Sequence, residues 1–147
     1  MQNEIKREIS INASQKRVYE AIANPELVVK WFPDAVEGNY VAGQYTVFKF
    51  GDCGRTQIYV KDAKPYDYFA YRWVPGAHNF DGDVLTVPNT LVEFFVEATG
   101  DNSCKVILTE SGFASLPADI MENSFNQNSK GWDHMMSRLP LSVEGAK

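Results

Sequence analysis

Two stretches of sequence decide the fold: Thr109-Glu110-Ser111-Gly112-Phe113 and, later in the chain, Gly131-Trp132. The first closes a strand-like run, Cys104 to Thr109, and the second lies inside the long segment with helical spacing, Ala118 to Leu139. Side chains that recur every three or four residues along that segment indicate one stripe of an α-helix. The stripe consists of Met121, Phe125, Asn128, Trp132, Met135 and Leu139. We therefore expect a sheet followed by a C-terminal helix whose stripe covers it.

Strand signals fill most of the chain before this point. Runs of alternating apolar and polar residues are separated by turns rich in Gly, Pro, Asn and Asp. The expected strands are Glu4 to Asn12, Gln44 to Phe50, Arg55 to Ala63, Tyr68 to Val74, Thr90 to Ala98 and Cys104 to Glu110, with a shorter one at Ala35 to Tyr40. The short connections favour an antiparallel meander.

Alternation along each strand assigns an inner face to the sheet, with Lys49 and Glu93 turned to solvent. The inward sets are Thr46, Phe48 and Phe50; Thr56, Ile58 and Val60; Phe69, Tyr71 and Trp73; Val92, Phe94 and Val96; and Val106, Leu108 and Glu110. Glu110 is the exception on this largely apolar face. A carboxylate placed there must be paired, hydrogen-bonded or at a wet edge of a cavity.

Two short helices are expected after the first strand. Ser14 can cap a helix that runs through Ala23, and Asn24 can cap a second one that ends before Pro33. In the C-terminal helix, Gly131 costs about 1 kcal/mol relative to Ala, which suggests a close approach to the sheet or room for the neighbouring indole. Pro140 is expected to end or kink that helix.

Length and charge limit the class of protein. A chain of 147 residues suits a single domain, residues 1–147, with a sizeable core. The net charge of −5 and the pI of about 5.0 argue against a nucleic-acid surface. No apolar stretch suits a signal peptide or a membrane span, so a cytoplasmic location is expected. Cys53 and Cys104 lie outside any CxxC spacing and are interpreted as free thiols.

Motifs for metal, nucleotide or covalent chemistry are missing from the sequence. His78 and His134 belong to no metal-binding pattern, and neither a GxSxG elbow nor a phosphate-binding glycine loop occurs. We therefore expect neither a cofactor nor a metal. Glu110 is the residue to single out for chemistry, because desolvation of an inward carboxylate would favour its protonated form. The alternative is that it pairs with Arg72 or with a helix-side amide such as Asn128, and only orders its surroundings.

Several segments, in this order and spacing, resemble one known family. They are Ile9 to Ala13 followed by Val18, Ala21 and Ile22; Pro25-Glu26-Leu27 with Trp31-Phe32; Gly43 followed by Phe48 and Phe50; Pro65 to Trp73; Thr90 to Phe94; Thr109 to Phe113; and Gly131-Trp132 with Leu139. The chain is similar to the activator-of-Hsp90-ATPase-homologue-like branch of the START-like (SRPBCC) superfamily. It departs from the usual pattern at Pro140 and in the long loop from Pro75 to Pro88, which contains His78 and Phe80.

This resemblance implies an α+β helix-grip fold, in which an antiparallel sheet curves around the C-terminal helix and encloses a cavity. A small apolar or amphipathic molecule bound there without catalysis is the leading hypothesis. The expected ligand-binding residues are Phe48, Phe50, Ile58, Tyr71, Trp73, Phe94, Leu108, Glu110, Met121, Phe125, Trp132 and Met135. The same aromatic residues could instead fill the space as a packed core.

Two other functions stay open at this point. One is an enzyme of the cyclase, dehydratase or hydrolase kind, in which Glu110 is the catalytic acid or base. The other is a co-chaperone that regulates an Hsp90-type ATPase, which rests on the resemblance alone. A homodimer is a further expectation, formed through the edge strand or through the outer sheet face, where Tyr59 and Phe95 would be exposed.

Overall fold

The strands of the protein form one sheet in the structure, a computed structural model that describes residues 3–51, 54–75, 79–80 and 83–144. The strands are β1 (Glu4–Ile11), β2 (Ala35–Gly38), β3 (Tyr45–Lys49), β4 (Arg55–Lys64), β5 (Tyr68–Trp73), β6 (Asn79–Phe80), β7 (Thr90–Gly100) and β8 (Ser103–Ser111). The order through the sheet is β1-β8-β7-β5-β4-β3-β2, and each of these neighbours is antiparallel. The short β6 pairs with β4 in parallel, outside this path. The expected antiparallel meander is confirmed.

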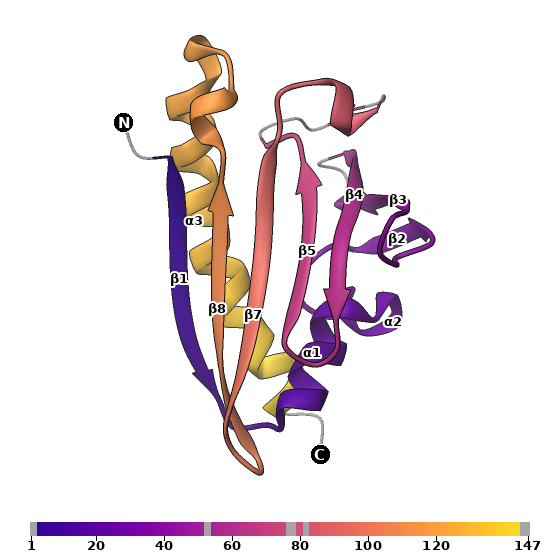
Figure 1. Cartoon of the computed structure of the whole chain (residues 1–147), viewed down its shortest axis with the longest axis vertical. Helices are drawn as coiled ribbons and strands as arrows, with labels where there is room; N and C mark the ends of the chain where they lie inside the picture. The colour runs from indigo at the N-terminus through magenta and orange to yellow at the C-terminus, as the bar shows by residue number, and fades with distance from the viewer. Residues whose placement is uncertain (1–2, 52–53, 76–78, 81–82, 145–147) are drawn as a thin grey trace.

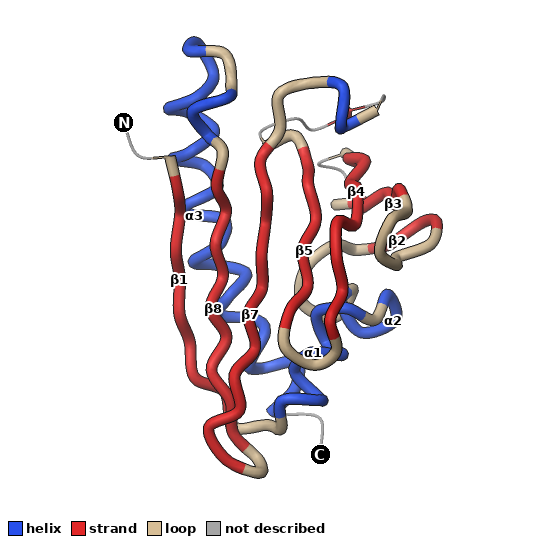
Figure 2. The backbone as a smooth tube through the Cα atoms, viewed as in Figure 1, coloured by secondary structure: helices blue, strands red, loops and turns tan. Residues whose placement is uncertain are grey.

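Three α-helices cover the inner face of this sheet. They are α1 (Gln15–Ala23), α2 (Pro25–Val28) and α3 (Ala118–Glu144), and two short 3₁₀ helices, η2 (Val84–Thr86) and η3 (Phe113–Ser115), flank the strands β7 and β8. The long α3 runs behind β1, β8 and β7, while α1 and α2 lie behind the lower end of the sheet (Figure 1). Figure 2 shows the same two layers, with the strands in front and the helices behind. The predicted helix-grip fold is confirmed.

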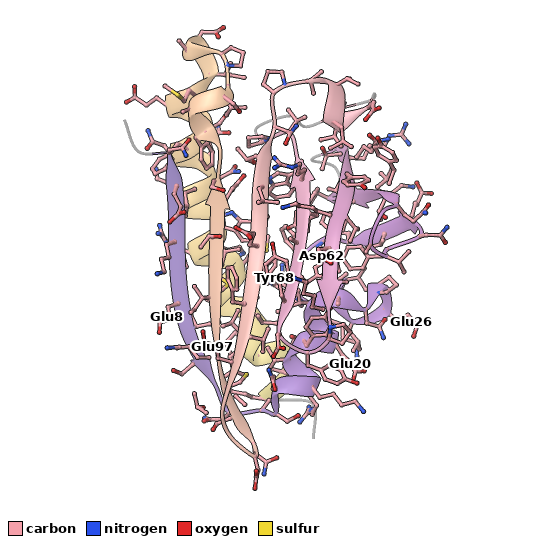
Figure 3. The ribbon with its side chains drawn as sticks, in the orientation of Figure 1. Glu8, Glu20, Glu26, Asp62, Tyr68 and Glu97 are labelled. Atoms are coloured by element: carbon pink, nitrogen blue, oxygen red, sulfur yellow. The ribbon has the colours of Figure 1, made fainter. Side chains whose placement is uncertain are left out.

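The side chains assigned to the inner face point into the protein. All fifteen positions in the five predicted inward sets are buried, apart from Phe50 and Trp73, which are half-buried. A β-bulge between Val60 and Asp62 shifts the register of β4 against β5 beyond that point. Polar side chains lie on the opposite face. There the Lys105 Nζ atom lies 3.1 Å from Oε1 of Glu8 and 3.8 Å from Oε1 of Glu97, and both glutamates are labelled in Figure 3. The inner layer between sheet and helices is therefore the core.

The second helix is shorter than expected. It spans only Pro25–Val28, and the chain continues in turns through Trp31 and Phe32 to Pro33. The cause is tertiary: the Trp31 indole N–H donates to the Ala21 carbonyl at 2.8 Å, and both aromatic rings are buried against the core. Burial of these rings outweighs the few hydrogen bonds that one more helical turn would supply.

The C-terminal helix differs from expectation at two positions. It does not end at Pro140 but continues to Glu144, because Val143 is buried and its carbonyl accepts a hydrogen bond from the Arg17 guanidinium. Gly131 is exposed, and a Cβ added there would meet no atom within 4 Å. The predicted close approach of Gly131 to the sheet is therefore wrong. An added side-chain carbon at this position would contact no strand.

Two of the residues singled out in the sequence lie outside the described part of the chain. Cys53 and His78 are not among the described residues, whereas Cys104 is buried in β8 as expected and His134 is exposed on α3. In the part of the chain that the structure describes, no helix has the length and apolar character needed to cross a membrane.

Candidate ligand-binding site

Glu110 lies at the centre of the candidate site, near the end of β8. Its neighbours across the sheet are Ile5 of β1 and Val92 of β7, so its side chain points from the inner face toward α3. The residue is 0% exposed. An acidic side chain buried to this extent needs hydrogen-bond donors for its oxygen atoms, because it has lost its water.

Four side chains supply those donors, and they come from three different elements. The indole N–H of Trp73 on β5 and the hydroxyl of Thr90 on β7 donate to Oε2, at 2.8 and 2.5 Å. The indole N–H of Trp132 on α3 donates to Oε1 at 2.8 Å. The Nδ2 group of Asn128, one turn earlier on α3, lies 2.9 and 3.0 Å from the two oxygens. The carboxylate thus ties three strands to the helix.

This network leaves the carboxylate little acceptor capacity. Two carboxylate oxygens accept about four hydrogen bonds, and the two indoles can only donate. All four donors are uncharged, so the negative charge is held by aligned dipoles rather than by a cation. Of the two partners expected from the sequence, Asn128 makes the contact, whereas Arg72 points to the other face and donates to Asn89 at 3.0 Å.

An aromatic cluster surrounds the carboxylate. The ring of Trp132 lies 5.7 Å from that of Trp73, 5.2 Å from that of Phe32 and 5.9 Å from that of Phe94, between ring centroids. Phe32 in turn lies 5.6 Å from Phe50 of the segment after β3. Centroid distances of 4.5 to 7 Å are those of favourable aromatic pairs, about 0.5 to 1.5 kcal/mol each beyond burial. The rings therefore hold both indoles in the positions that direct their N–H groups at Glu110.

Three members of the site, Thr90, Phe32 and Asn128, were missing from the expected ligand-binding residues, although Asn128 was expected as a partner of Glu110. Thr90 was assigned to a strand but not to its inner face, although it lies two residues before Val92 and alternation already places it there. Phe32 was named only in the segments that carry the family resemblance. The missing information is the pairing of β7 with β8, which places Thr90 next to the carboxylate.

The expected ligand-binding residues divide into two groups by burial. Seven are at most 2% exposed and pack against one another: Phe48, Ile58, Tyr71, Phe94, Leu108, Glu110 and Trp132. Five are half-buried and pack at the margin of the core: Phe50, Trp73, Met121, Phe125 and Met135. Solvent hardly reaches the first group. In this conformation a ligand can contact the second group directly, and the first only after side chains move.

The Tyr71 hydroxyl is a further unusual group on the inner face. Tyr71 is 0% exposed, and its hydroxyl has no hydrogen-bond partner among the described residues. Its ring lies 5.5 Å from those of Phe48 and Trp73, between centroids. Burial, with Tyr40 and Glu110 adding to the effect, raises the pKa of the Tyr71 phenol well above its ordinary value. The hydroxyl therefore stays protonated and able to donate.

A separate hollow of about 160 Å³ lies between α1, α2 and the end of α3. It is lined by Arg17, Glu20, Ala21, Leu27, Lys30, Ser142 and Val143. None of the expected ligand-binding residues is among them, and drug-sized ligands occupy pockets of about 300 Å³ or more. We therefore place the candidate site at the Glu110 network and not at this hollow.

The comparison with family models agrees with this architecture. The model for "Activator of Hsp90 ATPase homolog 1-like protein" matches residues 12–144, which is nearly the whole chain. The chain belongs to this family. No curated protein matches it. The resemblance expected from the sequence is confirmed, and the elements that carry it are those of the sheet and α3.

Solved structures of the same fold include three informative relatives. The protein MLL2253 from Mesorhizobium loti has a TM-score of 0.79 at 15% identity, with 98% of each chain covered. The Aha1 dimer from Colwellia psychrerythraea has a TM-score of 0.74 at 21% identity, with 97% of each chain covered. DynU16, from the dynemicin biosynthetic locus, has a TM-score of 0.77 at 23% identity; it is matched by 100% of this chain, which spans 49% of DynU16. At these identities the likeness shows the fold alone.

Proposed function

We propose that this family member binds a small, largely apolar or amphipathic molecule between the inner face of the sheet and α3, without catalysing a reaction. The observation that supports the proposal is the half-buried group of apolar side chains on the inward faces of β5, α3 and the end of β3. Trp73 belongs to this group and donates to Glu110, while Phe125 and Met135 flank Asn128 and Trp132 on the same helix stripe. Apolar side chains beside a few fixed polar groups are typical of ligand sites.

The Glu110 network supports binding over the enzyme alternative. A general acid or base must reach a proton of the substrate within about 2.6 to 3.2 Å. Here both carboxylate oxygens already accept hydrogen bonds from Trp73, Thr90, Asn128 and Trp132. A reaction at Glu110 would first require one of these donors to leave. The role that this arrangement favours for Glu110 is to orient two indoles, that of the buried Trp132 and that of Trp73 at the margin of the core.

Native mass spectrometry of the purified protein, followed by denaturing extraction, tests the proposal. We expect a small apolar molecule to travel with the protein and to be released on unfolding. Phe125→Ala should lower its occupancy, because this half-buried ring lies on the α3 stripe. Phe95→Ala is the matched control, since Phe95 is also half-buried but lies on the outer face of β7. A bare mass, together with no retention of an added library of apolar compounds, would contradict the proposal.

Protein partners stay predictions. The family name motivates an ATPase assay with an Hsp90-type protein, and absence of stimulation would remove the co-chaperone hypothesis.

The relative from Colwellia psychrerythraea is a dimer, which motivates light scattering to look for twice the chain mass of 16.6 kDa. The expected exposure of Tyr59 and Phe95 on the outer face is wrong: both are half-buried, and the ring of Phe95 lies 5.1 Å from that of Tyr68 between centroids. A cytoplasmic location also stays a prediction.

A further inference from the structure

The Tyr71 hydroxyl has an unmet hydrogen bond inside the core. Within the described part of the chain, three buried side-chain oxygen atoms lack a partner, those of Tyr19, Thr56 and Tyr71. Leaving a buried hydroxyl unpaired is unfavourable, because it has lost its water and gained no partner. Of the three residues, Tyr71 lies nearest to the site by strand register: it pairs with Val92 on β7, and Val92 pairs with Glu110 on β8. An incoming acceptor would relieve this cost.

Thr56 carries the second unpaired hydroxyl on the inner face. Thr56 lies opposite Phe48 in the pairing of β3 with β4, and the ring of Phe48 lies 5.5 Å from that of Tyr71. Tyr71, however, pairs with Val60, four residues along β4 from Thr56, so the two hydroxyls lie in different parts of the inner face. Because Tyr71 and Phe48 are both 0% exposed, a ligand oxygen reaches the Tyr71 hydroxyl only when side chains around it move. The Tyr71 hydroxyl therefore marks a place in the core where displacement of apolar side chains gains a hydrogen bond.

The charge of Glu110 restricts which acceptor can come there. Its four donors are uncharged, so no paired cation cancels its charge locally. A ligand carboxylate or sulfonate beside Tyr71 would meet this charge in a medium of low dielectric constant, where like charges repel strongly. A ligand hydroxyl would gain no hydrogen bond from Glu110, because the carboxylate oxygens are occupied, and a ligand ammonium would lose its hydration in this apolar core. An uncharged oxygen that only accepts suits both conditions.

We propose that the Tyr71 hydroxyl selects an uncharged apolar ligand by donating a hydrogen bond to its carbonyl oxygen, and that the Glu110 carboxylate excludes anionic ligands. The inference rests on the proposed function and adds the chemical class of the ligand, an apolar ketone or ester. Its apolar part contacts the half-buried group around Trp73 and Phe125, and its carbonyl oxygen accepts from the Tyr71 hydroxyl.

Equilibrium dialysis with three naphthalene derivatives of similar shape tests this inference. Acetylnaphthalene carries an uncharged carbonyl, ethylnaphthalene lacks it, and naphthoate carries a negative charge. One neutral hydrogen bond is worth about a fivefold difference in affinity. We therefore expect the wild type to bind acetylnaphthalene about fivefold more tightly than ethylnaphthalene, and to bind naphthoate most weakly.

Two tyrosine variants make the test specific. Tyr71→Phe should remove the fivefold preference by weakening only acetylnaphthalene binding. Tyr19→Phe is the matched control and should keep the preference, because it removes another unpaired buried hydroxyl, in a ring that contacts Tyr66 and Phe69 near α1. Loss of an unpaired hydroxyl should not lower the urea midpoint of either variant. A lower midpoint for Tyr71→Phe would indicate a structural hydrogen bond and overturn the inference.

The outcomes separate the inference from the proposed function. If acetylnaphthalene and ethylnaphthalene bind the wild type equally, or if naphthoate binds as tightly as the ketone, the inference is overturned while a ligand site remains. A preference that persists in Tyr71→Phe has the same consequence. If none of the three compounds binds, both the inference and the proposed function are overturned.

Discussion

Glu110 is the residue on which the candidate site depends. A carboxylate with four uncharged donors is stabilised only while those donors keep their directions, and each donor is fixed by the packing of its own element. Trp132 shows the arrangement well: its N–H is 2.8 Å from Oε1 while its ring packs on Phe32 and Trp73. At this scale the polar network and the aromatic core are one structure.

Glu110→Gln should lower the free energy of unfolding by about 2 to 4 kcal/mol. The substitution replaces one accepting oxygen with an NH₂ group, which then faces donors such as the indoles of Trp73 and Trp132. Urea unfolding followed by tryptophan fluorescence measures the change. Glu97→Gln, at an exposed position, should stay within about 0.5 kcal/mol of the wild type. Equal stability of both variants would show that the network contributes little to folding.

At the scale of the elements, Trp132 is the side chain that joins the helix α3 to the sheet. Trp132→Ala should cost about 3 to 5 kcal/mol, because it removes a ring that is 2% exposed. Trp132→Phe keeps much of the ring and removes the N–H donor, with an expected cost of about 1 to 3 kcal/mol. Thermal unfolding measured by circular dichroism distinguishes the two. If the alanine variant retains wild-type stability and ligand affinity, Trp132 has neither role.

Replacing either of two glycines by alanine should change the stability of the protein, in opposite directions. Gly131→Ala should stabilise the protein by up to about 1 kcal/mol, because the position is helical and an added methyl group meets open space. Gly112→Ala should destabilise it, since Gly112 has φ of 98° where the chain leaves β8, a backbone conformation that residues other than glycine rarely adopt. Chemical unfolding of both variants provides the measurement. Destabilisation by Gly131→Ala would mean that α3 needs flexibility there.

The whole molecule should lose stability at alkaline pH. Burial raises the pKa of Tyr40 and of Tyr71 well above the ordinary value, so the folded state keeps protons that the unfolded state releases. Stability from these groups is complete below the unfolded pKa of about 10 and falls as the pH rises above it. Urea midpoints between about pH 8 and pH 12 test this. Tyr71→Phe should make the decline shallower by about 1.4 kcal/mol per pH unit, and an unchanged slope would contradict the assignment.

Much of the architecture could be predicted because alternation and helical spacing are local properties. The inward sets of five strands and the stripe of α3 are read directly from residues such as Phe48, Phe94 and Trp132, and burial in the structure agrees with them. The errors share a different cause. The second helix is shorter because the indole N–H of Trp31 donates a hydrogen bond to the Ala21 carbonyl. The helix α3 continues past Pro140 because its residue Val143 is buried and accepts a hydrogen bond from Arg17 of α1. Contacts between distant segments decided both.

The sequence alone determined the order of the elements, the faces that they bury and the presence of one carboxylate on an apolar face, because each follows from the period of the backbone. Only the tertiary structure decided what that carboxylate does. Trp73, Thr90, Asn128 and Trp132 lie 18 to 37 positions from Glu110 along the chain and converge on it through strand pairing and helix docking. The unpaired hydroxyl of Tyr71 is likewise invisible in the sequence, since whether a buried group finds a partner depends on every element packed around it.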